Sequence, residues 1–244
     1  MTPTPDVISV IHTSNIQPFQ TNTTYDLDKD GIVDHIQVDT VNHNLLTITI
    51  NQSILITQIP QIDTEYYLAT LDFNLFTTQI IIPSEQKTHP KLNIFQYYNG
   101  KITLLGSIDG TMDEFKQNED CSFSTLGSGN VLCSWSHMWD YRIETNETKD
   151  FSLTRIDRKS YPMNMTVTVK RKIPLFEGPG IQKIISILNP GDEVQLVSTD
   201  DTQWVYIKHK KNNQKGWLMV NQFTGIIDSK KIPAYELFEG LSFD

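Results

Sequence analysis

An acidic segment near the start of the chain constrains its fold most strongly. From Asp26 to Asp34 a carboxylate stands at positions 1, 3, 5 and 9, and Gly31 at position 6 permits a tight turn. Alternating oxygen ligands, with a backbone carbonyl at position 7, are what a hard cation such as Ca²⁺ requires. Two carboxylates about 5 Å apart repel by roughly 3 kcal/mol at an effective dielectric of 20, so a cation would organise the turn. The predicted calcium ligands are Asp26, Asp28, Asp30, Ile32 (by its carbonyl) and Asp34.

The alternative for this segment is an aspartate-rich turn whose carboxylates cap backbone amides. The metal would be structural rather than catalytic, because it fixes the entry to a strand and has no nucleophile beside it in sequence. An extracellular module of this kind is expected to bind calcium with a dissociation constant of about 10⁻⁴–10⁻³ M.

Charge argues against two classes of partner. The net charge is −9, and the densest basic cluster, Lys208, Lys210, Lys211 and Lys215, surrounds one predicted hairpin and is expected to be a solvated turn. Neither nucleic acid nor an anionic membrane surface is therefore expected to be bound. No apolar run is long enough to predict a membrane span.

Short alternating runs separated by turn residues predict an all-β fold. Asn99-Gly100 predicts a two-residue hairpin, because both central positions of a type I′ turn need positive φ. The predicted strands are 36–41, 45–50, 53–57, 79–82, 92–97 and 102–105 in the first part of the chain, and 166–169, 184–188, 193–198, 204–208 and 216–220 in the second.

An internal repeat appears when the acidic segment is moved forward by 44 residues. Tyr25–Val38 then falls without a gap on Ala69–Ile82. A period in the forties with several short strands is typical of propeller blades. The second copy carries Thr70, Leu75 and Thr78 where the first has Asp26, Gly31 and Asp34, so it is not expected to hold calcium.

The apolar run 80–82 also predicts that the sheets are stacked, because a strand that is apolar on both faces must be covered on both faces. Two or three blades cannot close a ring. Their open edges must be covered or used for a protein partner.

The acidic segment, followed by a strand, resembles the calcium loop of FG-GAP/VCBS-type repeats in integrin-α-like propellers. It departs from the EF-hand, which needs a bidentate glutamate at position 12, where this chain has Gln37. The resemblance implies a partial propeller-like repeat domain over residues 1–160. The full signature is missing from the second copy.

Residues 165–223 resemble a bacterial SH3 (SH3b) domain. The carrying motifs are Val167-Thr168-Val169, Ile173-Pro174-Leu175-Phe176, Pro190-Gly191-Asp192-Glu193-Val194, Trp204-Val205-Tyr206-Ile207 and Gly216-Trp217-Leu218. The resemblance implies a small barrel over 161–225, with 226–244 as a C-terminal extension. Domains of this family commonly bind peptidoglycan peptides, which implies a cell-wall ligand.

Trp204, Tyr206, Trp217 and Phe223 are the predicted ligand-binding residues of this domain, since aromatic grooves hold extended ligands. The alternative is that Trp217, with Trp204 or Tyr206, belongs to the core of a very small barrel. Alternation places Trp204 and Tyr206 opposite Val205 and Ile207, so one of the two faces should be more exposed.

The pairing of the two modules is similar to exported proteins of Gram-positive gut Firmicutes. The polar start, Met1–Pro5, fits a chain whose export signal has been removed, so an extracellular or cell-surface location is expected. A cytoplasmic protein would also lack such a signal. The sequence leaves open whether Cys121 and Cys133 form a disulfide or remain two thiols.

The segment from Cys133 to Asp140 raises the alternative of a catalytic site. Catalysis needs a nucleophile, a base and an orienting group that converge in space. Cys133 and His137 can share a strand face, whereas Asp140 lies on the other. We therefore expect a non-catalytic binding protein, with a wall-acting enzyme, its regulatory subunit or a calcium-dependent adhesion module as alternatives.

Overall fold

The computed structural model describes residues 16–75, 77–85, 90–129, 131–133, 135–146 and 150–242. Met1–Pro5 and Ser134 lie outside these residues. Within them, regular structure is almost entirely strand, and helix is confined to η1 (Phe73–Leu75) and α1 (Ala234–Leu237). The prediction of an all-β fold is confirmed. In this described part, neither helix has the length and apolar character needed to cross a bilayer.

The chain divides into two compact units. Unit 1 comprises the described residues of 1–125 and 139–156, and unit 2 those of 126–138 and 157–244. The segment 126–138, which precedes the predicted boundary at 160, therefore belongs to unit 2. One of its contacts is a hydrogen bond of 2.8 Å from the Leu132 amide to the Gln222 carbonyl.

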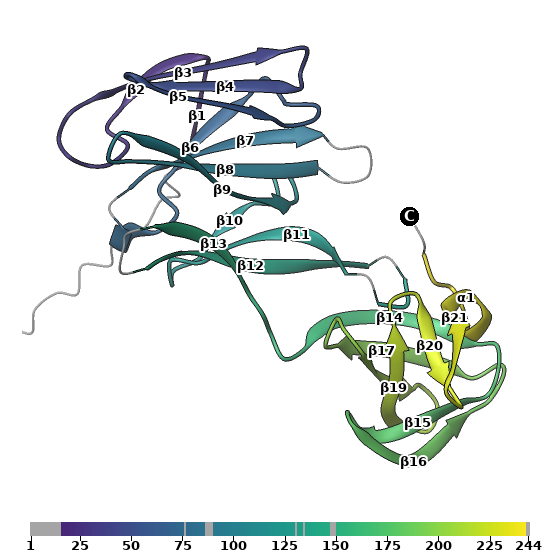
Figure 1. The fold of residues 1–244 in the computed structure, drawn as a ribbon. Coiled ribbons are helices and arrows are strands. Elements are labelled where there is room, and N and C mark those ends of the chain that lie inside the picture. The colour runs from purple at the N-terminus through teal and green to yellow at the C-terminus, as the bar shows by residue number, and fades with distance from the viewer. Residues whose placement is uncertain are drawn as a thin grey trace, which may run out of the picture. The chain divides into compact units, whose positions relative to one another are not determined.

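The described residues before 157 form three successive sheets (Figure 1). The first has the order β2 (Asn22–Tyr25), β3 (Asp34–Val41), β4 (Leu45–Ile50), β5 (Ser53–Gln58). The second has the order β1 (Ile16–Phe19), β6 (Tyr66–Ala69), β7 (Gln79–Glu85), β8 (Pro90–Tyr98), β9 (Lys101–Asp109). The third has the order β10 (Lys116–Gln117), β11 (Phe123–Gly129), β12 (Trp135–Thr145), β13 (Phe151–Ile156). In each sheet, the last two strands in chain order are also neighbours in the sheet, as in a meander.

Strand positions follow the offset of 44 residues found in the sequence. β6 starts and ends 44 residues after β2, and β11 starts and ends 44 residues after β7. The third sheet thus keeps this offset at β11, although its loop sequence is too eroded to show a third copy. Propeller blades are built from four-stranded sheets of this kind. The likeness to FG-GAP/VCBS repeats stays a prediction.

Two hydrophobic cores join the three sheets. Ile80 and Ile82 of β7 pack with the first sheet, whereas Ile81 packs with Phe123 and Ile143 of the third. All three isoleucines are at most 1% exposed. The prediction that the apolar run 80–82 lies between stacked sheets is confirmed, because successive strand residues face opposite sides of a sheet.

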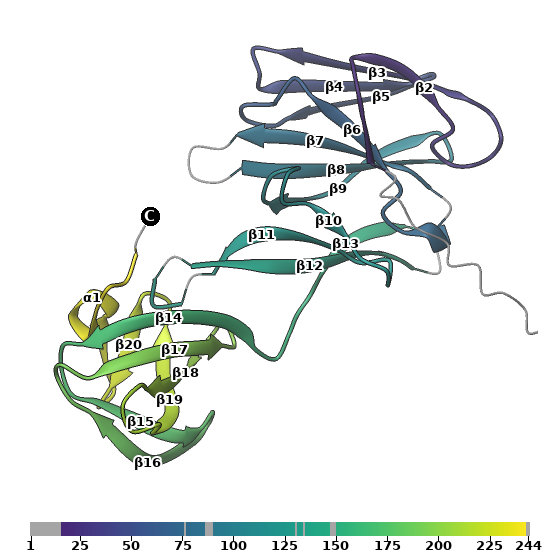
Figure 2. The same cartoon turned by 180° about the vertical axis from the view of Figure 1, so that it is seen from behind.

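From residue 161 on, unit 2 forms one curled sheet, visible from opposite sides in Figures 1 and 2. Its path is β16 (Ile181–Leu188), β15 (Ile173–Gly178), β19 (Lys215–Asn221), β18 (Trp204–His209), β17 (Glu193–Thr199), β14 (Tyr161–Val169) and β22 (Phe238–Glu239). β20 (Thr224–Ile227) pairs with β19 and with β21 (Lys230–Pro233).

Residues beyond 225 take part in this sheet and its core. Leu237 and Phe238 are at most 2% exposed, and β22 pairs antiparallel with β14. Gly225 leaves room for Leu237, since a Cβ at this glycine would lie 2.3 Å from the Leu237 Cδ1. The segment predicted as an extension is thus integrated into unit 2.

Candidate functional site

The acidic loop joins β2 to β3 and is anchored by one apolar residue. Leu27 is fully buried in the core between the first and second sheets, and its amide donates to the Asp34 Oδ2 over 2.9 Å. Gly31 has a φ of +88°, which glycine adopts without the steric cost of a side chain. The loop therefore turns sharply next to the buried side chain of Leu27.

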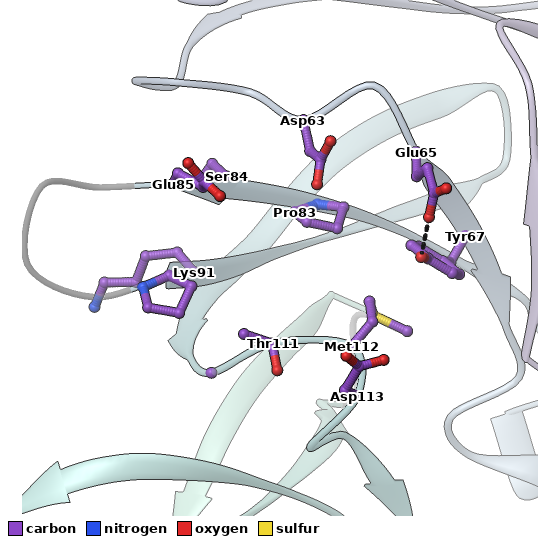
Figure 3. Close-up of a pocket in the computed structure, with 12 residues that line it drawn as sticks. Asp63, Glu65, Tyr67, Pro83, Ser84, Glu85, Lys91, Thr111, Met112 and Asp113 are labelled. Atoms are coloured by element: carbon purple, nitrogen blue, oxygen red, sulfur yellow. Dashed lines mark hydrogen bonds between the residues drawn. The ribbon is translucent and has the colours of Figure 1, made fainter.

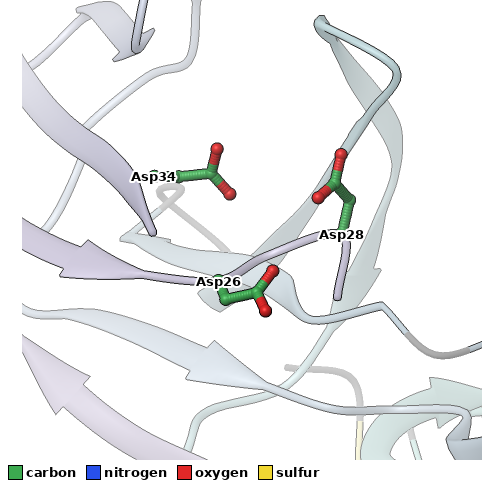
Figure 4. A group of neighbouring side chains, drawn as sticks. All are labelled: Asp26, Asp28 and Asp34. Carbon is green, nitrogen blue, oxygen red and sulfur yellow. The ribbon is translucent and has the colours of Figure 1, made fainter. Parts of the chain in front are cut away.

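Three of the predicted calcium ligands come together. Asp26, Asp28 and Asp34 each offer a carboxylate oxygen, and these oxygens lie within 4.8 Å of one another (Figure 4). Asp34 is 5% exposed, whereas the other two are half-buried. Partial burial raises the pKa of Asp28, and the charges of the three neighbouring aspartates raise it further.

The donor set fits a hard cation. The Oδ1 atom of Asp26 is buried and accepts no hydrogen bond from the described residues, while its Oδ2 accepts one from the Gly31 amide over 3.1 Å. A buried carboxylate oxygen without a donor is costly unless it meets a positive charge. Carboxylate oxygens are also the ligands that Ca²⁺ prefers.

The other two predicted ligands are not part of this group. The Asp30 Oδ1 accepts a hydrogen bond of 2.7 Å from the Ile32 amide, which closes a local turn. The Ile32 side chain is 68% exposed. Coordination by Asp30 or by the Ile32 carbonyl stays a prediction.

Asn51 supports the loop from outside and was not singled out in the sequence. It lies in the turn between β4 and β5, where the sequence does predict a tight turn, and its Nδ2 donates to the Asp34 Oδ1 over 2.7 Å. Its Oδ1 accepts from the His35 amide over 2.9 Å. The Asp34 carboxylate is thus held from both sides.

The second copy of the loop is closed differently. Thr70 and Thr78, which replace Asp26 and Asp34, share a hydrogen bond between their hydroxyls of 3.0 Å. The Leu71 amide donates to the Gln79 Oε1 over 2.9 Å, in the way that the Leu27 amide donates to Asp34. Among the described residues of this loop, no group of carboxylates lies at the corresponding place.

An aromatic face covers one side of unit 2. Trp204 and Tyr206 of β18 and Trp217 of β19 are half-buried, while Val205 and Ile207 between them are fully buried. Tyr206 stands directly opposite Trp217 across the two strands, with ring centroids 5.0 Å apart. The prediction that alternation leaves one face of this strand more exposed is confirmed.

Phe176 of β15 extends this face and was not among the predicted residues. It stands opposite Trp217, and its ring meets Trp204 edge to face at 6.1 Å. The sequence contained the signal, because Phe176 alternates with the buried Leu175. We define the aromatic face by Phe176, Trp204, Tyr206 and Trp217. Phe223 follows β19 in the turn to β20 and is 43% exposed.

The alternative catalytic segment shows a buried thiol. Cys133 is fully buried, and burial raises the pKa of its thiol to about 11. Its Sγ donates to the Met165 Sδ over 3.6 Å. A nucleophilic cysteine requires a thiolate, which this environment disfavours at neutral pH. His137 is 6% exposed and meets the Tyr161 ring edge to face at 4.8 Å.

Both cysteines are free thiols in the structure. Cys121 is half-buried and accepts a hydrogen bond of 3.4 Å from the Asn74 Nδ2 of the second loop.

An acidic pocket of about 230 Å³ lies in unit 1 (Figure 3). Tyr67 in its wall donates to the Glu65 Oε2 over 2.7 Å, and this bond, together with burial and nearby carboxylates, raises the pKa of Tyr67 to about 12. Lys91 forms an ion pair with Asp109. The other lining carboxylates are Asp63, Glu85 and Asp113.

The chain matches no family model, no curated protein and no solved structure. The fold and the sites define an all-β protein that has an acidic loop in one unit and an aromatic face in the other.

Proposed function

We propose that this chain is a calcium-stabilised, non-catalytic binding protein of the bacterial surface or exterior. Unit 2 recognises cell-wall material, a peptidoglycan peptide or glycan, through the aromatic face. Asp26, Asp28 and Asp34 hold Ca²⁺, which supports the fold of unit 1 and takes no part in chemistry.

The observation that carries this proposal is the exposure of the aromatic face. Tyr206 and Trp217 are both half-buried on one side of the sheet, while the core on the other side is filled by aliphatic residues such as Val205 and Leu218. The rings of Tyr206 and Trp217 thus lie on the side of the sheet opposite this aliphatic core. Aromatic-lined surfaces bind extended ligands, because flat rings give a large contact area with little loss of conformational entropy.

Calcium supports the proposal through the buried oxygen of Asp26. Three carboxylates within 4.8 Å of one another repel in the absence of a cation, and the Asp26 Oδ1 receives no hydrogen bond from the described residues. A divalent ion satisfies this oxygen and removes the repulsion. Its function is therefore to stabilise the entry to β3.

Co-sedimentation of the full chain with purified peptidoglycan sacculi tests the proposed function. The double variant Tyr206→Ala/Trp217→Ala is expected to bind at least about tenfold more weakly, a loss of about 1.4 kcal/mol. Tyr235→Ala is the matched control, because Tyr235 is an aromatic residue of the same unit that is 59% exposed on α1, outside the aromatic face. Retention of wild type no better than that of an unrelated acidic protein would refute the proposal.

A protein partner at an open sheet edge is a second candidate. β5 is the last strand of the first sheet, and its Ile54 and Ile56 are 65% and 63% exposed. Exposed apolar residues on an edge strand favour pairing with another chain. Calcium-dependent capture of a purified partner that is lost in Ile54→Thr/Ile56→Thr, but not in Tyr206→Ala/Trp217→Ala, would support it.

A further inference from the structure

Two lysines stand at one end of the aromatic face. Lys208 lies two residues after Tyr206 on β18, and Lys215 lies two residues before Trp217 on β19, so both lysines project from the side of the sheet that carries the aromatic rings. The register places Lys208 directly opposite Lys215, next to the pair of Tyr206 and Trp217. Apolar and cationic groups are therefore contiguous on this surface.

No described residue neutralises either of the two charges by an ion pair. Among the described residues, neither Lys208 nor Lys215 forms an ion pair, whereas Lys210 of the same hairpin pairs with Glu193 at 2.9 Å. The next residue across the sheet from Lys208 is Gln195, which is uncharged. Both lysines are exposed.

Such a pair is unfavourable in the free protein. Like charges directly opposite each other in an antiparallel ladder destabilise it, because the Cβ atoms of such a pair are only about 5 Å apart. An anionic group bound between the two ammonium groups reverses the sign of this interaction. In a chain of net charge −9, this local positive site is also distinct from the overall field.

We infer that Lys208 and Lys215 bind a carboxylate of the ligand whose apolar part lies on the aromatic face. This inference rests on the proposed function and narrows its ligand to a wall peptide with a free carboxylate. A carboxylate presents two oxygens, which suits two adjacent ammonium donors, and the rings of Tyr206 and Trp217 receive the aliphatic part of the same peptide.

Purified sacculi stripped of their phosphate-containing polymers test this, with half of the sample amidated to remove its carboxylate charge. Wild type is expected to bind the amidated sacculi about 3- to 10-fold more weakly, the effect of losing two exposed ion pairs. Lys208→Gln/Lys215→Gln should bind the untreated sacculi with the same loss and should not distinguish the two samples.

Lys210→Gln/Lys211→Gln is the matched control, because it removes two charges from the same hairpin outside the lysine pair. It should distinguish the two samples as wild type does. Near-ultraviolet circular dichroism checks that each variant is folded.

Each outcome bears on one level of the proposal. Equal binding of wild type to both samples would overturn the carboxylate inference and leave the proposed function standing. Loss of all binding when the phosphate polymers are removed would show that the lysines bind phosphate. This outcome would also overturn the carboxylate inference. Absence of wild-type binding to sacculi before any treatment would overturn the proposed function together with this inference.

A second measurement does not need the ligand. Lys208→Gln should raise the melting temperature of unit 2 at low ionic strength, and the gain should vanish in 1 M salt, where the Debye length is about 3 Å. A melting temperature that does not rise at low salt would contradict the repulsion on which the inference depends.

Discussion

The loop between β2 and β3 and the loop between β6 and β7 occupy equivalent places in successive sheets, but they are closed by different chemistry. In the first, Asp26 and Asp34 face each other as carboxylates. In the second, Thr70 and Thr78 stand at the same positions and share a hydrogen bond of 3.0 Å. In each loop a fully buried leucine follows the first of these positions directly: Leu27 follows Asp26, and Leu71 follows Thr70.

The two loops therefore share a backbone path but differ in their charge. The buried leucine and the bond from its amide to a side-chain oxygen are common to both loops, so they define the path of the chain. The hydroxyl pair is neutral and satisfied without any ligand. The carboxylates repel each other, and we propose that Ca²⁺ does for the first loop what one hydrogen bond does for the second.

The strongest test of this comparison is to give the second loop the charges of the first. Thr78 is 1% exposed and Thr70 is 9% exposed, so Thr70→Asp/Thr78→Asp creates two buried like charges. Without calcium the free energy of unfolding of unit 1 should fall by about 3–5 kcal/mol, the usual effect of an uncompensated buried charge. Urea denaturation of the full chain in chelator measures this.

Thr70→Ser/Thr78→Ser is the control, because it keeps both hydroxyls. It should lose less than half as much stability. An aspartate variant as stable as wild type in chelator would show that charge does not distinguish the two loops.

Removing charge from the first loop should give a smaller effect, whose sign depends on calcium. At a calcium concentration 100 times its dissociation constant, wild type should gain about 2.7 kcal/mol. Asp26→Asn/Asp28→Asn should lose this gain, yet it should melt no lower than wild type in chelator, because the repulsion is removed. Calorimetry in calcium and in chelator gives both values.

Asp72→Asn is the matched control at the position equivalent to Asp28. The Asp72 Oδ1 accepts from the Asn74 amide over 2.8 Å, a bond that the asparagine oxygen can also accept. This variant should keep the full calcium response. Equal melting of wild type in calcium and in chelator would count against the metal site.

The smallest expected effect concerns the backbone. Gly31 has a φ of +88° with no heavy atom within 4 Å of a Cβ at this position, so Gly31→Ala tests backbone strain alone. It should cost about 1 kcal/mol. Gly31→Asn should cost less, since asparagine tolerates positive φ better. Identical melting curves for Gly31→Ala and wild type would show that the turn is not strained.

Much of the fold could be read from local patterns. Alternation predicted the strands, the apolar run 80–82 predicted stacked sheets, and the offset of 44 residues recurs in the strand bounds. These patterns are visible because burial imposes a period of two on every strand that faces a core. A third copy could not be recognised in the sequence, because its loop residues do not follow the repeat and the offset is kept without change only at β11 of that sheet.

Other features depend on contacts between residues far apart in sequence. Asn51 supports Asp34 across 17 positions, and Phe176 reaches Trp217 only through strand pairing. Asp30 has the spacing of a ligand but accepts the Ile32 amide instead, because a local turn competes for its oxygen. No spacing rule identifies such partners.

The order of residues by itself determined that this chain forms sheets, that its front turn concentrates negative charge, and that aromatic residues alternate with aliphatic ones in the second unit. Only tertiary structure decided which three aspartates meet, that the two threonines of the next loop bond to each other, and that two lysines stand side by side beside the rings. The reason is that periodicity acts within a strand, whereas register between strands arises when separate segments bury their apolar faces together.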